Sequence, residues 1–167
     1  MRDDIRIDKS ARVKHLMCHG NHISIDMCVY CSVGLYMGDY VHIAPMTSII
    51  GGEKSSLTVG NFAGISTGAR IVCGSEDFVN SLLGFMPEEY KTVIYGHNVI
   101  SDFAWVGAGA IVLPGIYMAE GSVLGAGAVL TKDTEPWTVY VGNPAIPLKL
   151  RNKELILENA RKLGYER

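Results

Sequence analysis

The chain has 167 residues, 48% of them hydrophobic and 19% charged, and its formal net charge is −2 at pH 7. These values suit a single domain with an apolar core, and they give no basic surface for nucleic acid or an anionic membrane. No apolar run approaches the roughly 20 residues that a helix needs to cross a bilayer, and the first residues lack the features of a signal peptide, so we expect a cytoplasmic protein without membrane insertion.

An aliphatic residue, a methionine or a cysteine recurs at every sixth position over most of the chain. The positions are Ile25, Cys31, Met37, Ile43, Ile49, Val59, Ile65, Ile71, Ile100, Val106, Val112, Met118, Leu124 and Leu130. This period matches neither a helix nor a single strand, but it fits a short strand, a corner and the next strand. Three such sides make a triangular turn of about 18 residues, with the periodic residues pointing inward. The sequence therefore predicts an all-β fold, a parallel β-helix.

In chain order, the period is weak over residues 5–13 and is broken over residues 15–21. We expect an opening turn in the first of these segments and a bulge or loop in the second. Residues 51–56 are predicted to form a polar turn that widens one corner. Residues 73–98 are the one long interruption, and a loop of this length inside a compact repeat protein is usually functional.

After Leu130 the chain leaves the repeat. Residues 152–163 carry a helix-like apolar stripe that ends at Gly164, which predicts a short C-terminal α-helix. We therefore expect a β-helix domain over residues 1–150 and a C-terminal helix over residues 151–167. The open ends of a β-helix need covering, and this helix is a candidate for one of them.

Several motifs in the second half of the chain carry a family resemblance. They are Asp-Phe-Ala-Trp-Val-Gly-Ala-Gly-Ala from Asp102, Leu-Pro-Gly from Leu113, Gly-Ala-Gly-Ala from Gly125, Thr-Lys-Asp from Thr131 and Gly-Asn-Pro-Ala from Gly142. This ordered set resembles the hexapeptide-repeat acyltransferases, in the sugar O-/N-acetyltransferase branch similar to galactoside acetyltransferase. The resemblance covers roughly residues 25 to 150. It implies a left-handed β-helix, a homotrimer and acetyl-CoA as co-substrate.

The resemblance also implies an acceptor and a cofactor site. The acceptor would be a sugar or a nucleotide-linked amino sugar used for lipopolysaccharide or another surface polysaccharide. Acetyl-CoA would lie in the groove between two neighbouring prisms. The residues carried over to it by position are Trp105, Ala108, Ala126, Lys132, Lys149 and Arg151. Small residues allow a ligand to approach the main chain, and cations suit phosphates; the alternatives are plain corner residues and solvated surface cations.

At the position of the catalytic base this chain departs from the family pattern. Glu76 falls where galactoside acetyltransferases carry a histidine, and Asp77 follows it. A carboxylate can serve as base if burial or its acidic neighbour raises its pKa toward neutrality. The alternatives are that the acidic pair binds the sugar, or that it caps backbone amides within the loop.

His42 is the second candidate base. It lies at a different corner of the prism from Glu76, so the two could meet only across a trimer interface. For substrate binding we expect Phe78 and Tyr90 to serve as sugar-stacking platforms and His97 to lie at the margin of the site, where the long loop rejoins the repeat.

Metal binding is not expected. His15, His19 and His22 match no zinc spacing, and the body of the repeat offers only His42 and His97 as histidine ligands. Two alternatives to the acetyltransferase remain from other classes: a zinc enzyme similar to carbonic anhydrase on the same fold, and a non-catalytic trimeric scaffold.

Overall fold

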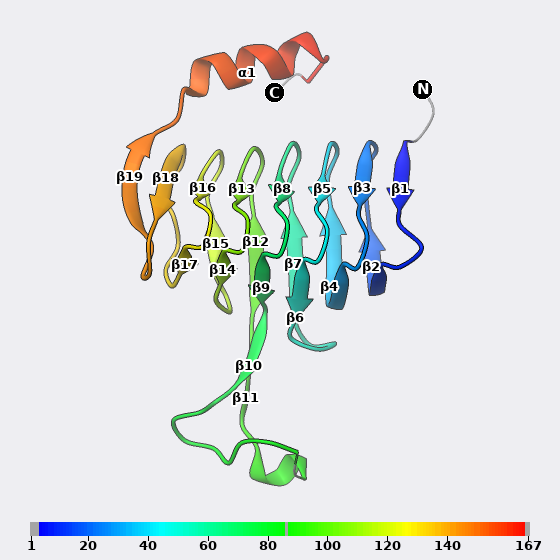
Figure 1. Ribbon diagram of the computed structural model, residues 1–167, viewed down its shortest axis with the longest axis vertical. Coiled ribbons are helices and arrows are strands. Elements are labelled where there is room, and N and C mark those ends of the chain that lie inside the picture. The colour runs from blue at the N-terminus through cyan, green and yellow to red at the C-terminus, as the bar shows by residue number, and fades with distance from the viewer. Residues whose placement is uncertain (1–3, 86, 166–167) are drawn as a thin grey trace.

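The structure is a computed structural model that describes residues 4–85 and 87–165. The chain winds into a left-handed parallel β-helix of about seven turns, with a single helix at its C-terminal end (Figure 1). The predicted fold class is confirmed. The outermost predicted domain bounds, residues 1 and 167, lie outside the described residues.

Eight strands stack along one side of the prism, which we call face A. They are β1 (Ile5–Ile7), β3 (Ile23–Ile25), β5 (His42–Ile43), β8 (Gly64–Ile65), β13 (Trp105–Val106), β16 (Val123–Leu124), β18 (Thr138–Val141) and β19 (Ile146–Leu150). Successive strands are parallel except for the last pair, β18 and β19, which is antiparallel.

The other two sides form one sheet of nine strands, because β2 and β4 are long enough to bend around the corner between them. The strands are β2 (Arg12–Cys18), β4 (Tyr30–Met37), β6 (Ser48–Ile50), β7 (Ser56–Val59), β9 (Arg70–Val72), β12 (His97–Ile100), β14 (Ile111–Val112), β15 (Tyr117–Met118) and β17 (Val129–Leu130). Before the corner, β4 pairs with β6, and after it β4 pairs with β7. We call the side with β6, β9, β14 and β17 face B, and the side with β7, β12 and β15 face C.

The periodic residues fill the interior as predicted. Each of them is at most 5% exposed, and together they form one continuous core along the axis of the prism. The segment His15–Cys18, in contrast, is not a loop. It belongs to β2 and pairs with β4 through two register shifts, so the broken period marks bulges in a strand.

Most of the predicted long loop is an arm that leaves the prism between β9 and β12 (Figure 1). Its base is an antiparallel hairpin of β10 (Gly74–Glu76) and β11 (Val93–Tyr95), and a 3₁₀ turn, η1 (Glu88–Tyr90), lies beyond it. We call residues 74–95 the arm. Its described tip exposes several apolar side chains, among them Phe78, Val79, Leu82 and Phe85.

The C-terminal helix α1 (Lys153–Lys162) begins at Asn152, whose side chain accepts a hydrogen bond from the Leu155 amide at 3.1 Å. The expectation that it covers an open end is wrong. It runs across the corners of several successive turns, next to face A (Figure 1). There Ala160 packs with Phe103 and Trp137 because the corner presents apolar rings that would otherwise face water.

Those rings form what we call the corner stack, a column of residues with positive φ at the corner that precedes face A. Neighbouring centroids lie 4.5, 4.6, 5.2 and 5.8 Å apart along the series His22, Tyr40, Phe62, Phe103 and Trp137. Gly121 occupies the rung before Trp137, and a Cβ there would lie 2.4 Å from the indole ring. The glycine therefore leaves the space that the tryptophan ring fills.

Gly107 should be intolerant of a side chain for a different reason. A Cβ there would come within 2.7 Å of backbone atoms of the next turn. We expect Gly107→Val to lower the free energy of unfolding by about 1–3 kcal/mol or more, because the turns would have to separate. Gly34→Ala is the control, since its Cβ meets nothing closer than 3.6 Å and should change stability by less than about 1 kcal/mol. Equal urea-unfolding midpoints for the two variants would contradict this explanation.

Candidate functional site

The outward side chains of face A form one row across the strands. The register pairs place in this row Arg6, Ser24, His42, Gly64, Trp105, Val123, Val139 and Lys149. The candidate base His42 therefore lies on the same face of the prism as Trp105 and Lys149, which the sequence analysis assigned to the coenzyme. The row is the first indication of a site.

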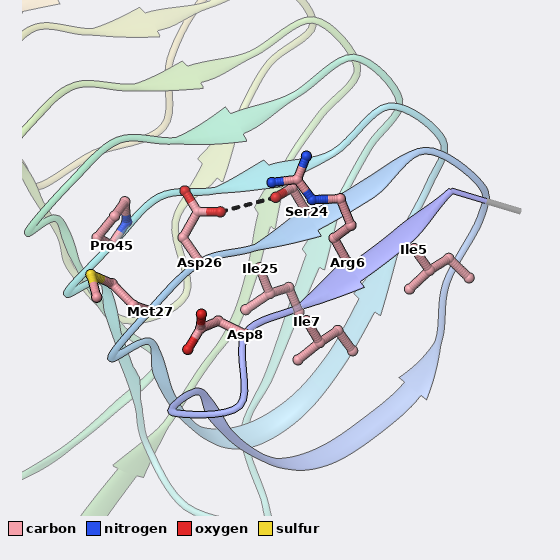
Figure 2. Close-up of a pocket in the computed structure, with 9 residues that line it drawn as sticks. All are labelled: Ile5, Arg6, Ile7, Asp8, Ser24, Ile25, Asp26, Met27 and Pro45. Carbon is pink, nitrogen blue, oxygen red and sulfur yellow. Dashed lines mark hydrogen bonds between the residues drawn. The ribbon is translucent and has the colours of Figure 1, made fainter.

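His42 is held by a carboxylate. Its Nε2 donates to Asp26 Oδ2 at 2.8 Å, and Ser24 Oγ donates to Asp26 Oδ1 at 2.9 Å. Figure 2 shows the bond between Ser24 and Asp26 beside Arg6. All three residues line a cavity of about 520 Å³. A neutral imidazole that donates from Nε2 carries its lone pair on Nδ1, which can accept a proton. This arrangement has the parts of a general base and its orienting group.

Trp105 lies two strands from His42, over the glycine between them. A Cβ on Gly64 would be only 2.3 Å from the Trp105 ring, so the indole occupies the space that a side chain at position 64 would take. Trp105 is 38% exposed. Face A thus presents a broad apolar ring beside a polar pair, a combination common at ligand sites.

Glu76 lies on the arm, in β10. One carboxylate oxygen accepts from the Gly84 amide at 3.2 Å, and the other forms an ion pair with Lys91 Nζ at 3.2 Å. These contacts, the Gly84 amide above all, lower the pKa of Glu76. The described chain therefore lacks the raised pKa on which a base role of Glu76 depends.

Asp77 folds the arm. Its Oδ1 accepts from the amides of Val79 and Asn80 at 3.0 and 3.1 Å, and its Oδ2 accepts from Asn80 Nδ2 at 3.1 Å. The same contacts, the Asn80 side chain first, lower the pKa of Asp77. Among the alternative roles of the acidic pair, the structure favours backbone capping for Asp77.

The three residues expected to bind substrate do not lie together. Phe78 and Tyr90 are both exposed on the arm. His97 begins β12 at the root of the arm, where its Nδ1 is bonded to Ser56 Oγ at 2.8 Å. It lines a cavity of about 690 Å³ on face C.

Ala108 and Ala126, the small residues expected to contact the cofactor, lie at the corner after face A. The Gly127 amide donates to the Ala108 carbonyl at 2.8 Å, so Ala108 and Ala126 sit one above the other on successive turns. Both have accessible surface. Lys132 is exposed at another corner, the one that follows face B, whereas Lys149 is exposed on β19 of face A.

Arg151 has a different environment from the other two cations. Its Nη1 donates to the carbonyls of Phe103 and Gly121, both at 2.7 Å, and its guanidinium lies 5.8 Å from the centre of the Trp137 ring. Partial burial lowers the pKa of Arg151. These contacts tie the chain before α1 to the corner stack, so they favour a structural role over phosphate binding.

Paired variants separate these two roles. Arg151→Met leaves two carbonyls without their donor, and we expect it to lower the free energy of unfolding by about 1–3 kcal/mol. Lys149→Met removes a solvated cation and should change stability by less than about 0.5 kcal/mol. Urea unfolding and calorimetry with coenzyme A measure both quantities. If Arg151→Met has normal stability but binds coenzyme A more weakly, Arg151 contacts the phosphates of the coenzyme and has no structural role.

The Asp26 carboxylate should make stability depend on acid. The bond from His42 is the main cause that lowers the pKa of Asp26 below its ordinary value of 3.8. Its contribution is therefore complete above pH 3.8 and is lost as the pH falls through the lower folded-state value. We expect Asp26→Asn to be less stable than the wild type at pH 7, and we expect this difference to shrink as the pH falls below 3.8. Urea unfolding at pH 7 and at a pH below 3.8 tests this, and a difference that is the same at both would contradict it.

Asp26 and Ser24 were not singled out from the sequence. Ser24 precedes His42 by 18 residues, the length of one triangular turn, so counting back one turn would have placed it beside the histidine. Over the described ranges, no group of three or more His, Cys, Asp or Glu side chains is arranged to hold a metal ion. No helix among the described residues is long and apolar enough to span a membrane.

Comparison with known proteins identifies relatives along most of the chain. A dTDP-4-amino-4,6-dideoxy-D-glucose acyltransferase of Escherichia coli is 36% identical over 142 residues, which cover 82% of this chain and 73% of that protein. A chloramphenicol acetyltransferase of Agrobacterium fabrum is 35% identical over 108 residues, 57% of this chain and 52% of the relative. No family model matches the sequence.

Solved structures that resemble this chain are also acyltransferases. A variant of AntD, an N-acyltransferase from Bacillus cereus in complex with dTDP and coenzyme A, superposes with a TM-score of 0.88 at 29% identity, covering 97% of this chain and 89% of AntD. Another AntD variant, bound to dTDP-4-amino-4,6-dideoxyglucose and coenzyme A, gives a TM-score of 0.85 at 28% identity, with 96% and 89% covered.

Fold and relatives together define the class of protein: this chain is an enzyme, an acyltransferase. It belongs to the hexapeptide-repeat acyltransferase family, which includes sugar acetyltransferases, dTDP-amino-sugar acyltransferases and chloramphenicol acetyltransferases. The zinc enzyme and the non-catalytic scaffold are not favoured by these relatives.

Proposed function

We propose that this enzyme transfers an acyl group, most simply acetyl, from acyl-CoA to the amine of a nucleotide-linked amino sugar. The observation that carries the proposal is the similarity to AntD, because it extends over 97% of this chain and AntD binds both dTDP and coenzyme A. The E. coli relative acts on an amino sugar of the same chemical class.

The reaction forms a C–N bond and breaks the thioester C–S bond, so the amine loses one proton and the thiol of coenzyme A is released. His42 is suited to take the proton, since Asp26 orients the imidazole and stabilises the imidazolium that results. Glu76, whose pKa is lowered by the Gly84 amide and Lys91, is suited to accept a hydrogen bond from the amine. Asp77 would support Glu76 by holding the arm in shape.

We propose that the coenzyme binds at the corner after face A. Ala108 and Ala126 lack bulky side chains there, so the pantetheine arm could lie against the main chain. Trp105 offers an exposed ring on the adjoining face, and Lys149 with Lys132 supplies positive charge for the nucleotide phosphates. Phe78 and Tyr90 are retained as sugar-stacking residues on the arm.

We also propose a homotrimer. The arm exposes Phe78, Leu82 and Phe85, and β19 exposes Ile146 and Leu148. Apolar clusters of this kind normally mark an interaction surface. A neighbouring copy that receives the arm would cover it and would bring Glu76 to a second prism, where it could meet His42. Light scattering should give a mass three times that of one chain.

The biological setting follows from the chemistry. An acylated nucleotide amino sugar is a precursor for surface polysaccharides such as lipopolysaccharide. Acyl-CoA is supplied in the cytoplasm, so we place the enzyme there.

A turnover screen tests the proposed function. The purified enzyme is mixed with acetyl-CoA and dTDP- or UDP-linked amino sugars, free amino sugars and chloramphenicol, and thiol release is followed together with product mass. We expect an N-acetylated nucleotide sugar. Faster thiol release with chloramphenicol than with every nucleotide sugar would overturn the proposal.

A further inference from the structure

Glu76 is joined to two other parts of the arm through its carboxylate. Its Oε2 accepts from the Gly84 amide at 3.2 Å, and its Oε1 is paired at 3.2 Å with Nζ of Lys91, the residue that follows η1. A carboxylate oxygen can accept two hydrogen bonds, so each oxygen keeps one acceptor position. The Glu76 side chain is 36% exposed. It can therefore receive a further donor from solution without losing either contact.

Lys91 is the better shielded partner of this ion pair. Its side chain is 18% exposed, whereas Lys162, which pairs with Glu158 at 2.8 Å on α1, is 64% exposed. Charges that are withdrawn from water are screened less by solvent and salt. The Lys91 ammonium therefore acts on the Glu76 carboxylate more strongly than the cation of an exposed surface pair acts on its partner.

The backbone holds the two side chains within reach of each other. The amide of Thr92, next to Lys91, donates to Ser81 Oγ at 2.7 Å, and the Thr92 carbonyl accepts from the Asp77 amide at 2.8 Å. Asp77 follows Glu76 directly. The segment that carries Lys91 is thus tied to the end of the strand that carries Glu76.

The arm has no second cation that could replace Lys91. Residues 74–95 contain the carboxylates of Glu76, Asp77, Glu88 and Glu89, and Lys91 is the one lysine or arginine among them. Asp77 is adjacent to Glu76, but its own carboxylate bonds to Asn80 and to backbone amides. Without Lys91, Glu76 would lie in an arm whose charged side chains are all acidic.

We propose that Lys91 is a positioning residue for the acceptor: it keeps the Glu76 carboxylate charged and fixed in direction, so that the free acceptor positions meet the sugar amine. Lys91 acts through Glu76 and contacts neither the acceptor nor the coenzyme. The Gly84 amide holds the second oxygen, so the cation and the backbone orient the carboxylate together. This inference rests on the proposed function, because it names the residue that prepares Glu76 for the amine of the same acceptor.

Steady-state kinetics with a nucleotide amino sugar and acetyl-CoA test this role. Lys91→Met should raise the acceptor KM about threefold to tenfold and leave kcat and the KM for acetyl-CoA within about twofold, because Glu76 only binds the amine. Lys91→Arg keeps a cation that suits a carboxylate and should restore the acceptor KM to within about twofold of the wild type. Lys162→Met is the matched control, since it breaks a lysine–glutamate pair on α1, on the other side of the prism from the arm (Figure 1), and should behave like the wild type.

A double variant separates positioning from general support of the arm. If Lys91 acts through Glu76, adding Lys91→Met to Glu76→Gln should change the acceptor KM by less than about twofold. A carbon NMR titration of the Glu76 carboxyl, assigned by its loss in Glu76→Gln, gives a readout without substrate. Removal of the cation should raise the pKa of Glu76 toward its ordinary value.

The same pKa of Glu76 in Lys91→Met and in the wild type would overturn the inference. A further rise in the acceptor KM when Lys91→Met is added to Glu76→Gln would also overturn it, because Lys91 would then only support the fold of the arm. An unchanged acceptor KM in Lys91→Met, with normal acetylation of a nucleotide sugar, would refute the inference and leave the proposed function intact. A raised pKa of Glu76 in an enzyme that acetylates no nucleotide sugar would refute the proposed function and leave Lys91 as the residue that keeps Glu76 charged.

Discussion

His42→Ala is expected to lower kcat by about a hundredfold or more, with little change in the KM for acyl-CoA. The reason is that the variant removes the group proposed to accept the amine proton, while the coenzyme contacts remain. Asp26→Asn should lower kcat less, because the imidazole is still present but has lost the carboxylate that orients it. Initial rates of thiol release at saturating acetyl-CoA measure both effects.

Glu76→Gln is the informative comparison for that experiment. An ionised carboxylate that only binds the amine should affect the acceptor KM more than kcat when it is replaced by an amide. A large loss of kcat in Glu76→Gln with near-normal turnover in His42→Ala would move the base to the arm. In that case the lowered pKa of Glu76 in the isolated chain would have to be reversed in the assembled site.

Trp137→Ala is expected to lower the free energy of unfolding by about 3–5 kcal/mol. Trp137 is only 7% exposed, and its ring packs on Phe103 and in the space above Gly121. The variant would leave a cavity between the corner stack and α1, and it would remove the ring that faces Arg151.

Trp105→Ala is the control, because the same residue type at 38% exposure should lose much less stability. Urea unfolding of both variants checks this. A change smaller than about 1 kcal/mol in Trp137→Ala would show that α1 is not anchored by the corner stack.

The fold could be predicted from the sequence because the periodic residues are the ones that must be buried. Ile65, Val106 and Leu124 lie on consecutive turns of face A and are fully buried, although 41 residues separate the first two. The arm adds length to one turn without disturbing the stacking of the turns around it. The six-residue period can therefore still be recognised on both sides of the arm, whereas the constant spacing of about 18 residues between turns is lost across it.

The corner stack could not be found in the same way. Insertions make the spacing of its members irregular, and aromatic residues with positive φ are uncommon. A weaker signal exists in the residue before the first rings, because Asn21, Asp39 and Asn61 precede His22, Tyr40 and Phe62. The Asn21 amide donates to Asp39 Oδ1 at 2.7 Å, and the Asp39 amide donates to Asn61 Oδ1 at 2.8 Å. An Asn or Asp before an aromatic residue is thus compatible with this corner, but it does not identify it, because Asp77-Phe78 lies on the arm and Trp137 follows a proline.

The candidate site was predicted only in part, since chain position alone does not show what a polar side chain bonds to. Glu76 and Asp77 are adjacent in the sequence, yet Glu76 pairs with Lys91 while Asp77 caps amides of its own loop. Arg151 resembled a phosphate ligand because its partners, two backbone carbonyls, leave no trace in the sequence.

The proposed acyl transfer is most directly tested by steady-state acetylation of dTDP-4-amino-4,6-dideoxyglucose, with thiol release and product mass measured together. We expect saturable kinetics in both substrates and one acetyl group on the sugar nitrogen. No thiol release with any nucleotide-linked amino sugar, from an enzyme that still binds coenzyme A, would contradict the proposed function.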